Sequence, residues 1–515
     1  MRISVDNPRV FLYNKRKNKV KRCYVMKQKF QVLTLFCAVL LGFSACGDTE
    51  TTPSGVPVET ESAVSTEAAE TEEAPLFTAL PEKDYGGYTF TILTRDGDDH
   101  RMEAFAEAEN GEPINDAVYL RNSLVGERYN VKFDFVYADE GNEYTLTDLV
   151  RESVMAGSED YDLAIPQTTY GGFAAPDGFY YNWLEMPYVD FNKPWWNADS
   201  AKRLTINNKL HIAIGDYLMT QIDYTWCMIF NKAMVADYDL ENPYQLVKDG
   251  KWTIDVFADY IKNISADING DGKMTIDDRF GFATQNDSAF GTWSYSTDLS
   301  VAEYDKDGRP IITIDNEKTY EVVEKLYSIM YEGDNTFIIG GWQDEEALVP
   351  RYESGGILML ATKFNAISPL RSMKTDFGVL PYPKYDEAQE RYFTQVDLHA
   401  GVLMIPVTLS DPERSGMIIE ALNEASNRYV IPAYYDITLK TKGARDDESA
   451  EMLDLILDGR YITFVSAYEG WEGVQWFMIN VLKNKKTDFA SHYEKNIKKS
   501  LTRYDKIFEA YSNMD

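Results

Sequence analysis

The segment Tyr88-Thr89-Phe90-Thr91-Ile92-Leu93-Thr94 begins the pattern that decides the fold. Its apolar and polar residues alternate in the manner of a β-strand. A helical pattern over 115–127 follows, then a second strand at 131–135, a second helix at 147–156 and a third strand at 161–165. This β-α-β-α-β order predicts a largely parallel sheet covered by helices, so the expected fold class is α/β.

Helix signals continue this alternation toward the end of the chain. Thr253 is a predicted N-cap, and Asp411 is a second one, followed by Pro412 at the first helical position. The spacing of Ile497, Leu501, Tyr504 and Phe508 predicts an amphipathic C-terminal helix. With about 430 residues after the N-terminal segments, the chain is long enough for more than one lobe.

Residues 1–45 have the order of a signal peptide. Basic residues precede an apolar run from Phe30 to Phe43 that is too short to span a bilayer as a mature helix. The run ends in Phe43-Ser44-Ala45-Cys46-Gly47, which resembles a bacterial lipobox, so we expect cleavage before Cys46 and lipidation of its thiol. An ordinary secretory signal with an incidental cysteine is the alternative. Met26 is a second candidate start for this leader.

An acidic segment rich in Thr, Glu and Ser covers residues 46–84, and it predicts a disordered tether because it has little apolar surface to bury. The whole chain carries a formal net charge of −32. Since the leader holds ten basic residues and one acidic residue, the remainder carries −41. Such a charge disfavours nucleic acid, anionic lipid surfaces and anionic substrates, and it is compatible with a neutral ligand.

Four cysteines occur in the chain, and only one is expected in the folded body. Cys23 and Cys37 belong to the leader, and Cys46 is the expected lipidation site. We therefore expect no disulfide within the mature chain and no cysteine metal site. Cys227 lies in an apolar run, which predicts a buried thiol.

The chain from about 85 to 510 resembles the family 1 extracellular solute-binding proteins, a group that includes maltose- and oligosaccharide-binding proteins. Each motif behind this resemblance is common alone, but six in the right order are specific. One departs from the family pattern, because Phe230 stands where the Tyr-Asn-Lys signature has Tyr. The motifs lie at Leu210–Ile214, Ile229–Lys232, Pro243–Phe257, Glu353–Met359, Phe377–Lys384 and Gly401–Pro406.

The resemblance implies a two-lobed, periplasmic-binding-protein-like fold of type II. Lobe one is expected from 85–213 and 340–397, and lobe two from 214–339 and 398–515. The implied function is that of the extracytoplasmic, membrane-anchored binding component of an ABC importer, which closes its lobes around a small neutral solute, first of all a carbohydrate, and delivers it to permease subunits. A monomer without nucleic-acid partners is expected.

Ligands of open α/β sheets lie at the carboxyl ends of the strands. Sugars present apolar faces and hydroxyl rims, so aromatic and polar residues that follow predicted strands, or lie at the crossings between lobes, are candidate contacts. Core packing is the alternative for each aromatic residue. The candidate contacts are Arg95, Asp96, Gln167, Tyr170, Asp223, Trp226, Trp342, Asp397 and Tyr434.

The segment 267–278 matches the EF-hand loop pattern of oxygen donors, with Gly272 at the sharp turn. The predicted Ca²⁺ ligands are Asp267, Asn269, Asp271, Lys273 through its carbonyl oxygen, and Asp278. A hydrated turn without metal is the alternative, since Asp278 stands where a longer Glu normally binds. A bound calcium ion would stiffen lobe two without touching the ligand.

We do not expect an enzyme. The chain has no Gly-x-Ser-x-Gly elbow, and its four histidines are scattered, which disfavours zinc hydrolysis. A secreted glycoside hydrolase stays the main rival because 83 acidic residues guarantee chance carboxylate pairs. A surface glycan-capture or sensor lipoprotein without a transport role is the third reading.

Overall fold

A computed structural model describes residues 75–514 except 140, 307–308, 342–346, 371–372, 444–445 and 469–472. The predicted leader, the lipidation site Cys46, most of the predicted tether and Trp342 lie outside the described residues. Within the described part of the chain, no helix is both long enough and apolar enough to cross a membrane.

The predicted β-α-β-α-β unit is confirmed and forms a three-stranded parallel sheet in the order β2-β1-β3. Ile92 of the central strand faces Phe135 on one side and Leu163 on the other. Asn130 and Gly157 adopt left-handed backbone conformations and end the two helices. The unit consists of β1 (Tyr88–Arg95), α3 (Pro113–Tyr129), β2 (Val131–Ala138), α4 (Thr145–Ala156) and β3 (Leu163–Ala164).

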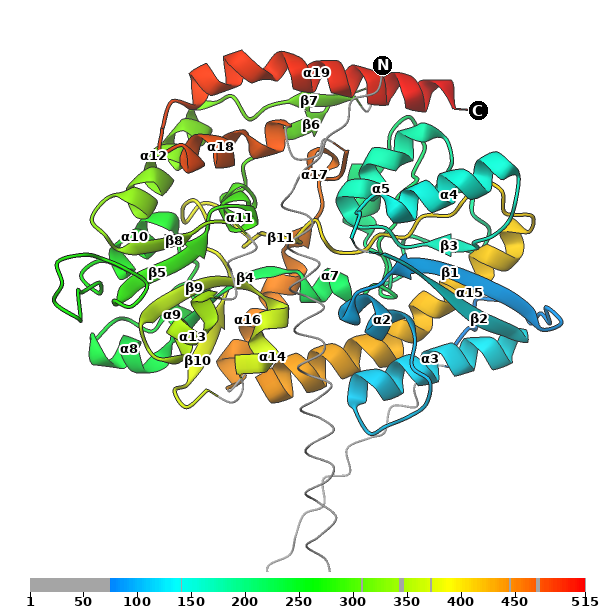
Figure 1. The fold of residues 1–515 in the computed structure, drawn as a ribbon, viewed down its shortest axis with the longest axis horizontal. Coiled ribbons are helices and arrows are strands. Elements are labelled where there is room, and N and C mark those ends of the chain that lie inside the picture. Colours follow the sequence, from blue (N-terminus) through cyan, green and yellow to red (C-terminus); the bar gives the residue numbers. More distant parts are fainter. Residues whose placement is uncertain are drawn as a thin grey trace, which may run out of the picture. The chain divides into compact units, whose positions relative to one another are not determined.

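A second sheet has five strands in the order β10-β4-β9-β5-β8. β5 pairs in parallel with β8 and β9, whereas β4 is antiparallel to both of its neighbours. Figure 1 shows this sheet and the three-stranded sheet on opposite sides of α7 (Thr220–Asp223) and β11 (Thr394–Gln395). The strands are β4 (Trp226–Asn231), β5 (Phe280–Gln285), β8 (Thr336–Ile339), β9 (Ile357–Lys363) and β10 (Phe377–Leu380).

The strand pairing contradicts the predicted division of the chain into lobes. Residues 340–397 do not join lobe one, because β9 and β10 pair with β4 and belong to the five-stranded sheet. The start of 398–515 does not join lobe two, because Leu403 and Met404 pair with Ala213 and Ala164. The chain crosses near residues 213 and 397, as predicted, but not near residue 340, so it stays in lobe two from β4 to β11. It then returns to lobe one, and later segments pack on lobe two again through contacts of α16 (Asp447–Asp458) with β10.

Two of the chain segments that connect the lobes lie beside each other. The segment after α7 enters β4, and the returning segment pairs with it through the bridge between Thr225 and Val396. The returning chain then builds α15 (Pro412–Ala425), which packs on α3, and the π-helical turns 426–430 and 433–443. The crossing segments therefore lie between the two sheets.

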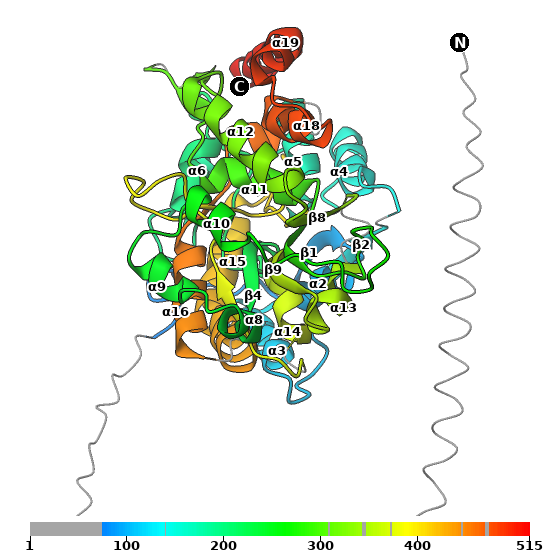
Figure 2. The same cartoon turned by 90° about the vertical axis from the view of Figure 1, so that its left-hand side faces the viewer.

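The predicted C-terminal helix is confirmed as α19 (Phe489–Asn513), in which Tyr504 of the predicted apolar face is buried together with Tyr511. Leu501, which was predicted on the same face, is exposed. The helix packs on α18 (Phe477–Lys483), as Figure 2 shows, and on α12 (Glu317–Tyr331). Near its end, the Tyr511 ring lies 5.1 Å from the ring of His211. This helix contacts both lobes.

Other local predictions are also confirmed. The Thr253 hydroxyl accepts from Val256 N at 3.4 Å, and Asp411 Oδ1 accepts from Arg414 N at 3.0 Å. Cys227 is free and buried. The other helices are α2 (Asp98–Ala104), α5 (Thr168–Ala174), α6 (Ala198–Leu204), α8 (Lys232–Asp237), α9 (Pro243–Lys248), α10 (Ile254–Tyr260), α11 (Ser288–Ser296), α13 (Leu348–Glu353), α14 (Ile367–Leu370), α16 (Asp447–Asp458) and α17 (Phe464–Tyr468), and the other strands are β6 (Ala302–Tyr304), β7 (Pro310–Ile312) and β12 (Arg460–Tyr461).

Candidate functional site

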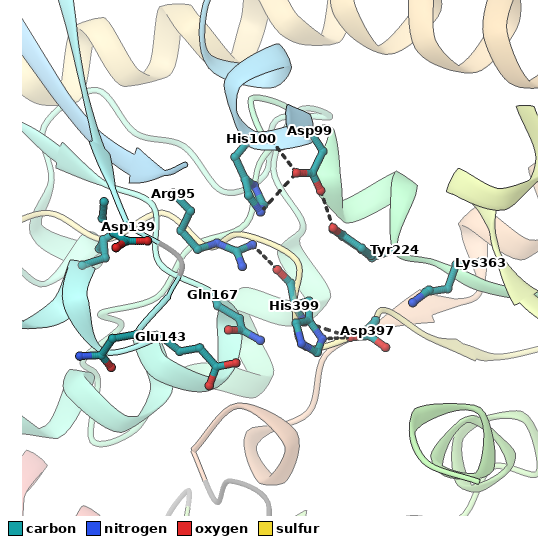
Figure 3. Close-up of a pocket in the computed structure, with 13 residues that line it drawn as sticks. Arg95, Asp99, His100, Asp139, Glu143, Gln167, Tyr224, Lys363, Asp397 and His399 are labelled. Atoms are coloured by element: carbon teal, nitrogen blue, oxygen red, sulfur yellow. Dashed lines mark hydrogen bonds and ion pairs between the residues drawn. The ribbon is translucent and has the colours of Figure 1, made fainter. Parts of the chain in front are cut away.

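A cavity of about 330 Å³ lies at the carboxyl ends of the three parallel strands of lobe one. Arg95 ends β1, Ala138 ends β2, and Gln167 follows β3. Lys363, the last residue of β9, reaches the same cavity from lobe two (Figure 3). The cavity therefore lies at the edge of the sheets where open α/β folds bind their ligands.

One wall of the cavity is the loop between β2 and α4, which we call the acidic wall and define by Asp139, Asn142 and Glu143. Asp139 Oδ1 accepts a hydrogen bond from Gly141 N at 2.8 Å. Glu143 Oε2 accepts a hydrogen bond from the Tyr170 hydroxyl. Among the described residues, neither carboxylate has a cationic partner, so this wall presents carboxylate oxygens to the cavity.

Gln167 lies beside the acidic wall, and Figure 3 shows its amide among the cavity residues. Only 3% of this residue is exposed, and its Nε2 is a buried donor without a hydrogen-bond partner in the described structure. A buried amide donor without a partner costs about 1–3 kcal/mol. A ligand oxygen in the cavity would remove that cost.

The opposite wall, which we call the crossing wall, comes from the chain segments between the lobes. Asp397 is 2% exposed, and its Oδ1 accepts from His399 N at 3.1 Å and contacts His399 Nδ1 at 2.7 Å. Its Oδ2 accepts from Trp226 Nε1 at 3.2 Å. Lys363 Nζ lies 5.1 Å from the centre of the Trp226 ring and 5.7 Å from that of Tyr224. The charged and polar groups of this wall are therefore paired with one another.

The charges on the crossing wall explain the ionisation of Asp397. Burial acts to raise the pKa of this carboxyl, but His399 and Lys363 together hold the pKa well below its usual value. Arg95 Nη2 donates to the His399 carbonyl oxygen and links β1 to this wall. Asp397 is therefore an anion whose charge is balanced by His399 and Lys363 within the protein.

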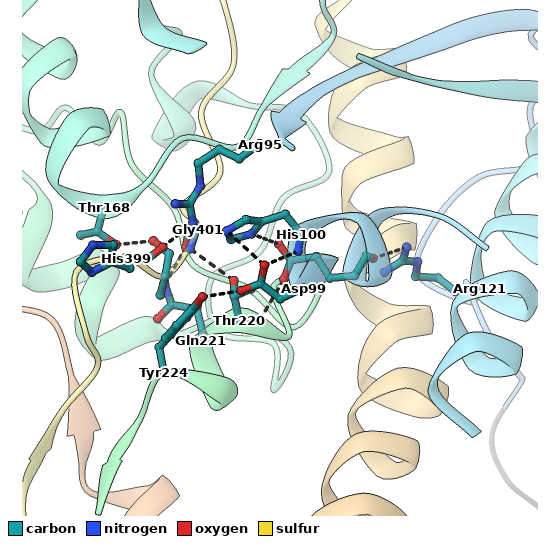
Figure 4. A network of polar contacts seen from close by, with 12 residues as sticks. Arg95, Asp99, His100, Arg121, Thr168, Thr220, Gln221, Tyr224, His399 and Gly401 are labelled. Carbon is teal, nitrogen blue, oxygen red and sulfur yellow. Dashed lines mark hydrogen bonds and ion pairs between the residues drawn. The ribbon is translucent and has the colours of Figure 1, made fainter. Parts of the chain in front are cut away.

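A polar network continues from the cavity floor into lobe one (Figure 4). Asp99 Oδ2 accepts the Tyr224 hydroxyl, and His100 Nδ1 lies 3.7 Å from Glu103 Oε1. Burial acts to raise the pKa of Asp99, but His100 and the Tyr224 hydroxyl bring it below its usual value. Glu103 Oε2 accepts from Thr220 N at 2.9 Å, so the network connects α2 to α7.

Arg121 closes this network behind the cavity. Its guanidinium is fully buried, and Nη2 donates to the carbonyl oxygens of Glu103 and Ala104 at 2.9 and 3.0 Å. Burial lowers the pKa of Arg121. In the crossing segment, Gln221 Nε2 donates to the Gly401 carbonyl oxygen at 2.6 Å. These bonds fix the backbone on which the cavity is built.

Three of the nine predicted ligand contacts, Arg95, Gln167 and Asp397, line the cavity. Tyr170 is 5% exposed and stands behind Glu143, to which it donates. Trp226 is fully buried and supports Asp397. Trp342 lies outside the described residues. Whether any of these residues contacts a ligand stays a prediction.

The other three predicted contacts do not line this cavity. Asp96 follows β1 but turns to the surface, where its Oδ1 pairs with Arg101 Nε at 2.5 Å. Asp223 and Tyr434 are buried and bind each other, with the Tyr434 hydroxyl donating to Asp223 Oδ1. Burial raises the pKa of Asp223 to about 7. Local sequence does not reveal that these two side chains satisfy each other inside the protein.

Several cavity residues were not among the predicted contacts. Asp139 and Glu143 were missed because the predicted strand 131–135 is shorter than β2, which runs to Ala138. Lys363 was missed because the buried strand motif was read only to Met359, whereas β9 continues to Lys363. The signal that could have found them is strand length, since polar residues just after a strand end lie at the carboxyl rim.

The predicted calcium loop folds as a series of tight turns in lobe two. Asp267 Oδ1 and Oδ2 accept from Gly270 N and Gly272 N at 2.6 and 2.8 Å, and both glycines have positive φ angles. Asp278 Oδ2 accepts from Thr275 N at 2.8 Å. Among the described residues, no group of three acidic, histidine or cysteine side chains is placed to hold a metal ion. Calcium binding stays a prediction.

No protein-family model matches the chain, and the search of curated sequences finds no match. Solved structures do match it. A cyclo/maltodextrin-binding protein complexed with maltotetraose has a TM-score of 0.53 at 14% identity, over 82% of this chain and 97% of that one. The GacH receptor of Streptomyces glaucescens, solved unliganded and with acarbose, has a TM-score of 0.51 at 12% identity, over 83% and 100% of the two chains.

A third match is the maltose/maltodextrin-binding domain MalE from Bdellovibrio bacteriovorus bound to maltotriose. Its TM-score is 0.51 at 12% identity, over 81% of this chain and 99% of that domain. These likenesses confirm the predicted fold class, since all three structures have the two-lobed, periplasmic-binding-protein-like α/β fold. This chain has the same fold.

Proposed function

We propose that this protein is the extracytoplasmic solute-binding component of an ABC importer and that it binds a carbohydrate without turning it over. The observation that carries the proposal is the cavity at the carboxyl ends of the strands, in a fold shared with solved sugar-binding proteins. Its lining offers donors from Gln167 and Arg95 and acceptors from Asp139 and Glu143. Sugar hydroxyls both donate and accept, so they match such a mixed lining.

Binding proceeds by closure of the two lobes around the solute. Lys363 of lobe two lines the cavity, and the other charged groups of the lining come from lobe one and the crossing segments. The ligand stabilises the closed state through the contacts it makes only there. Membrane permease subunits then recognise the closed form. Lipidation of Cys46 keeps the monomeric protein at the membrane surface.

A thermal-shift screen of residues 75–515 against neutral mono- and oligosaccharides, sugar derivatives and short peptides tests this function. A ligand at a hundred times its dissociation constant stabilises the folded state by about 2.7 kcal/mol. We expect a small set of sugars to raise the unfolding midpoint and to be recovered unchanged after prolonged incubation. A response to peptides alone would refute the carbohydrate assignment, and cleavage of the sugar would favour the hydrolase.

A further inference from the structure

The two walls of the cavity differ in how far their charged groups are paired with other groups of the protein. On the crossing wall, Asp397 is bonded by His399 and Trp226, and Lys363 lies against the Trp226 and Tyr224 rings. On the acidic wall, the only described bonds to the carboxylates of Asp139 and Glu143 are those from Gly141 N and the Tyr170 hydroxyl. The positive groups are engaged, whereas the two carboxylates of the acidic wall have no cationic partner among the described residues.

The formal charge of the lining points in the same direction. Asp99, Asp139, Glu143 and Asp397 are carboxylates, whereas Arg95 and Lys363 are the fixed cations. Among the described residues, the carboxylates of the lining therefore outnumber its Arg and Lys cations by two. A sugar acid would bring a further negative charge against this lining, which is unfavourable in a partly enclosed site.

Gln167 supplies an independent sign that a ligand group belongs beside the acidic wall. It is 3% exposed, it lines the cavity, and its Nε2 has no partner in the described structure. The donor and the two carboxylates lie on the same side of the cavity (Figure 3). A ligand that fits them all has an oxygen acceptor for the amide and a positively charged donor for the carboxylates.

We propose that the cavity selects an amino sugar, a polyhydroxylated ring whose protonated amine binds the carboxylates of Asp139 and Glu143 while a ring hydroxyl accepts from Gln167. This proposal rests on the proposed carbohydrate-binding function and narrows its substrate class. The ammonium makes charge-assisted hydrogen bonds to the two carboxylates, which are about twice as strong as neutral ones.

The test uses probes that differ in a single substituent. Titration calorimetry compares glucosamine, glucose, N-acetylglucosamine and glucuronate, with the galacto and manno series and the corresponding disaccharides beside them, and spermidine as an amine without a sugar ring. We expect the free amine to bind at least about tenfold more tightly than its neutral counterpart and the uronate to bind most weakly. Raising the pH until the amine loses its proton removes the preference, and added salt weakens it.

Two variants test whether the preference for the amine comes from the acidic wall. Asp139→Asn and Glu143→Gln keep the size of each side chain, and we expect each to reduce the ratio of amine to neutral affinity by about tenfold. Asp134→Asn is the control, because Asp134 is exposed on β2 outside the cavity lining. We expect this control to leave the ratio unchanged.

The outcomes separate the two proposals. Equal binding of amine and neutral sugars, or tighter binding of the uronate, overturns the amino-sugar proposal and leaves the carbohydrate function standing. Binding of spermidine without any sugar overturns the carbohydrate function. The absence of binding by every probe overturns both. An unchanged ratio in Asp139→Asn and Glu143→Gln places any amine preference elsewhere and overturns the assigned residues.

Discussion

The crossing wall and the acidic wall enclose the same cavity but are built in opposite ways. The crossing wall joins Asp397, His399, Trp226 and Lys363 into a set whose members satisfy one another, and Asp397 is 2% exposed. The acidic wall is a surface loop in which Asp139 and Glu143 are exposed and each has one described hydrogen bond. The first wall resembles a protein core and the second an unfilled site.

This difference shows which residues serve folding and which are available for binding. A buried charge with complete partners is held in one position and has little left to offer a ligand. An exposed carboxylate is cheap to maintain without a partner, because water solvates it until a ligand replaces the water. We therefore expect substitutions on the crossing wall to change stability and substitutions on the acidic wall to change affinity.

The largest effect is expected from Asp397→Ala. The change leaves the Trp226 indole N–H and the His399 backbone N–H without their acceptor and removes the anion that Lys363 faces. We expect the free energy of unfolding to fall by about 3 kcal/mol, measured by urea denaturation. Asp96→Ala is the matched control, since its pair with Arg101 is exposed and worth about 0–1 kcal/mol. Equal losses in the two variants would break the contrast between buried and exposed carboxylates.

A pH dependence follows from Asp223, which is buried beside the crossing segment. Burial raises the pKa of this carboxyl to about 7. A raised pKa means that Asp223 stabilises the folded state in its protonated form, so this stability is full below about pH 4 and is lost as the pH rises through about 7. We expect Asp223→Asn to raise the free energy of unfolding at pH 8, on the order of 2–4 kcal/mol, and to have little effect at pH 4.

Denaturation of wild type and Asp223→Asn at several pH values measures this effect. Burial also raises the pKa of Glu420 to about 7, so the variant keeps part of the dependence on pH. Asp134→Asn, on the exposed face of β2, serves as the control and should follow wild type at every pH. A variant that is equally stabilised at pH 4 and pH 8 would show that ionisation is not the cause.

Sequence alone predicted the first sheet and its helices, because strand alternation and the helical spacing of apolar residues are local signals. It did not predict the return of residues 401–404 to lobe one, since the pairing of Met404 with Ala164 joins segments far apart in the chain. At the site, Arg95 and Gln167 were found because they follow strands directly. Asp223 and Tyr434, two of the predicted ligand contacts, do not line the cavity, and only the folded structure shows that their side chains bind each other.

The substitution Gln167→Leu tests whether this residue, which lies beside the acidic wall, serves binding or stability. The substitution removes the Nε2 donor that has no partner in the described structure, so we expect the free protein to be as stable as wild type or slightly more stable. Affinity for the sugar should fall by about tenfold, because the ligand oxygen loses its donor. Calorimetry measures the affinity, and Gln245→Leu on the exposed face of α9 is the control. A destabilised variant with unchanged affinity would assign Gln167 to the scaffold.

The smallest effect concerns the loop 267–278, which contributes no residue to the lining of the cavity. If the loop binds calcium with the affinity typical of extracellular modules, millimolar calcium stabilises the protein by about 1–2 kcal/mol. Asp271→Asn keeps the oxygen that accepts from Lys273 N at 2.9 Å but removes the charge, so it should abolish the calcium response without unfolding the loop. Sugar affinity should be the same with and without calcium, because the loop lies in lobe two and contributes nothing to either wall. A calcium-dependent affinity would show that the rigidity of lobe two, and not only the lining of the cavity, sets how tightly the walls hold their ligand.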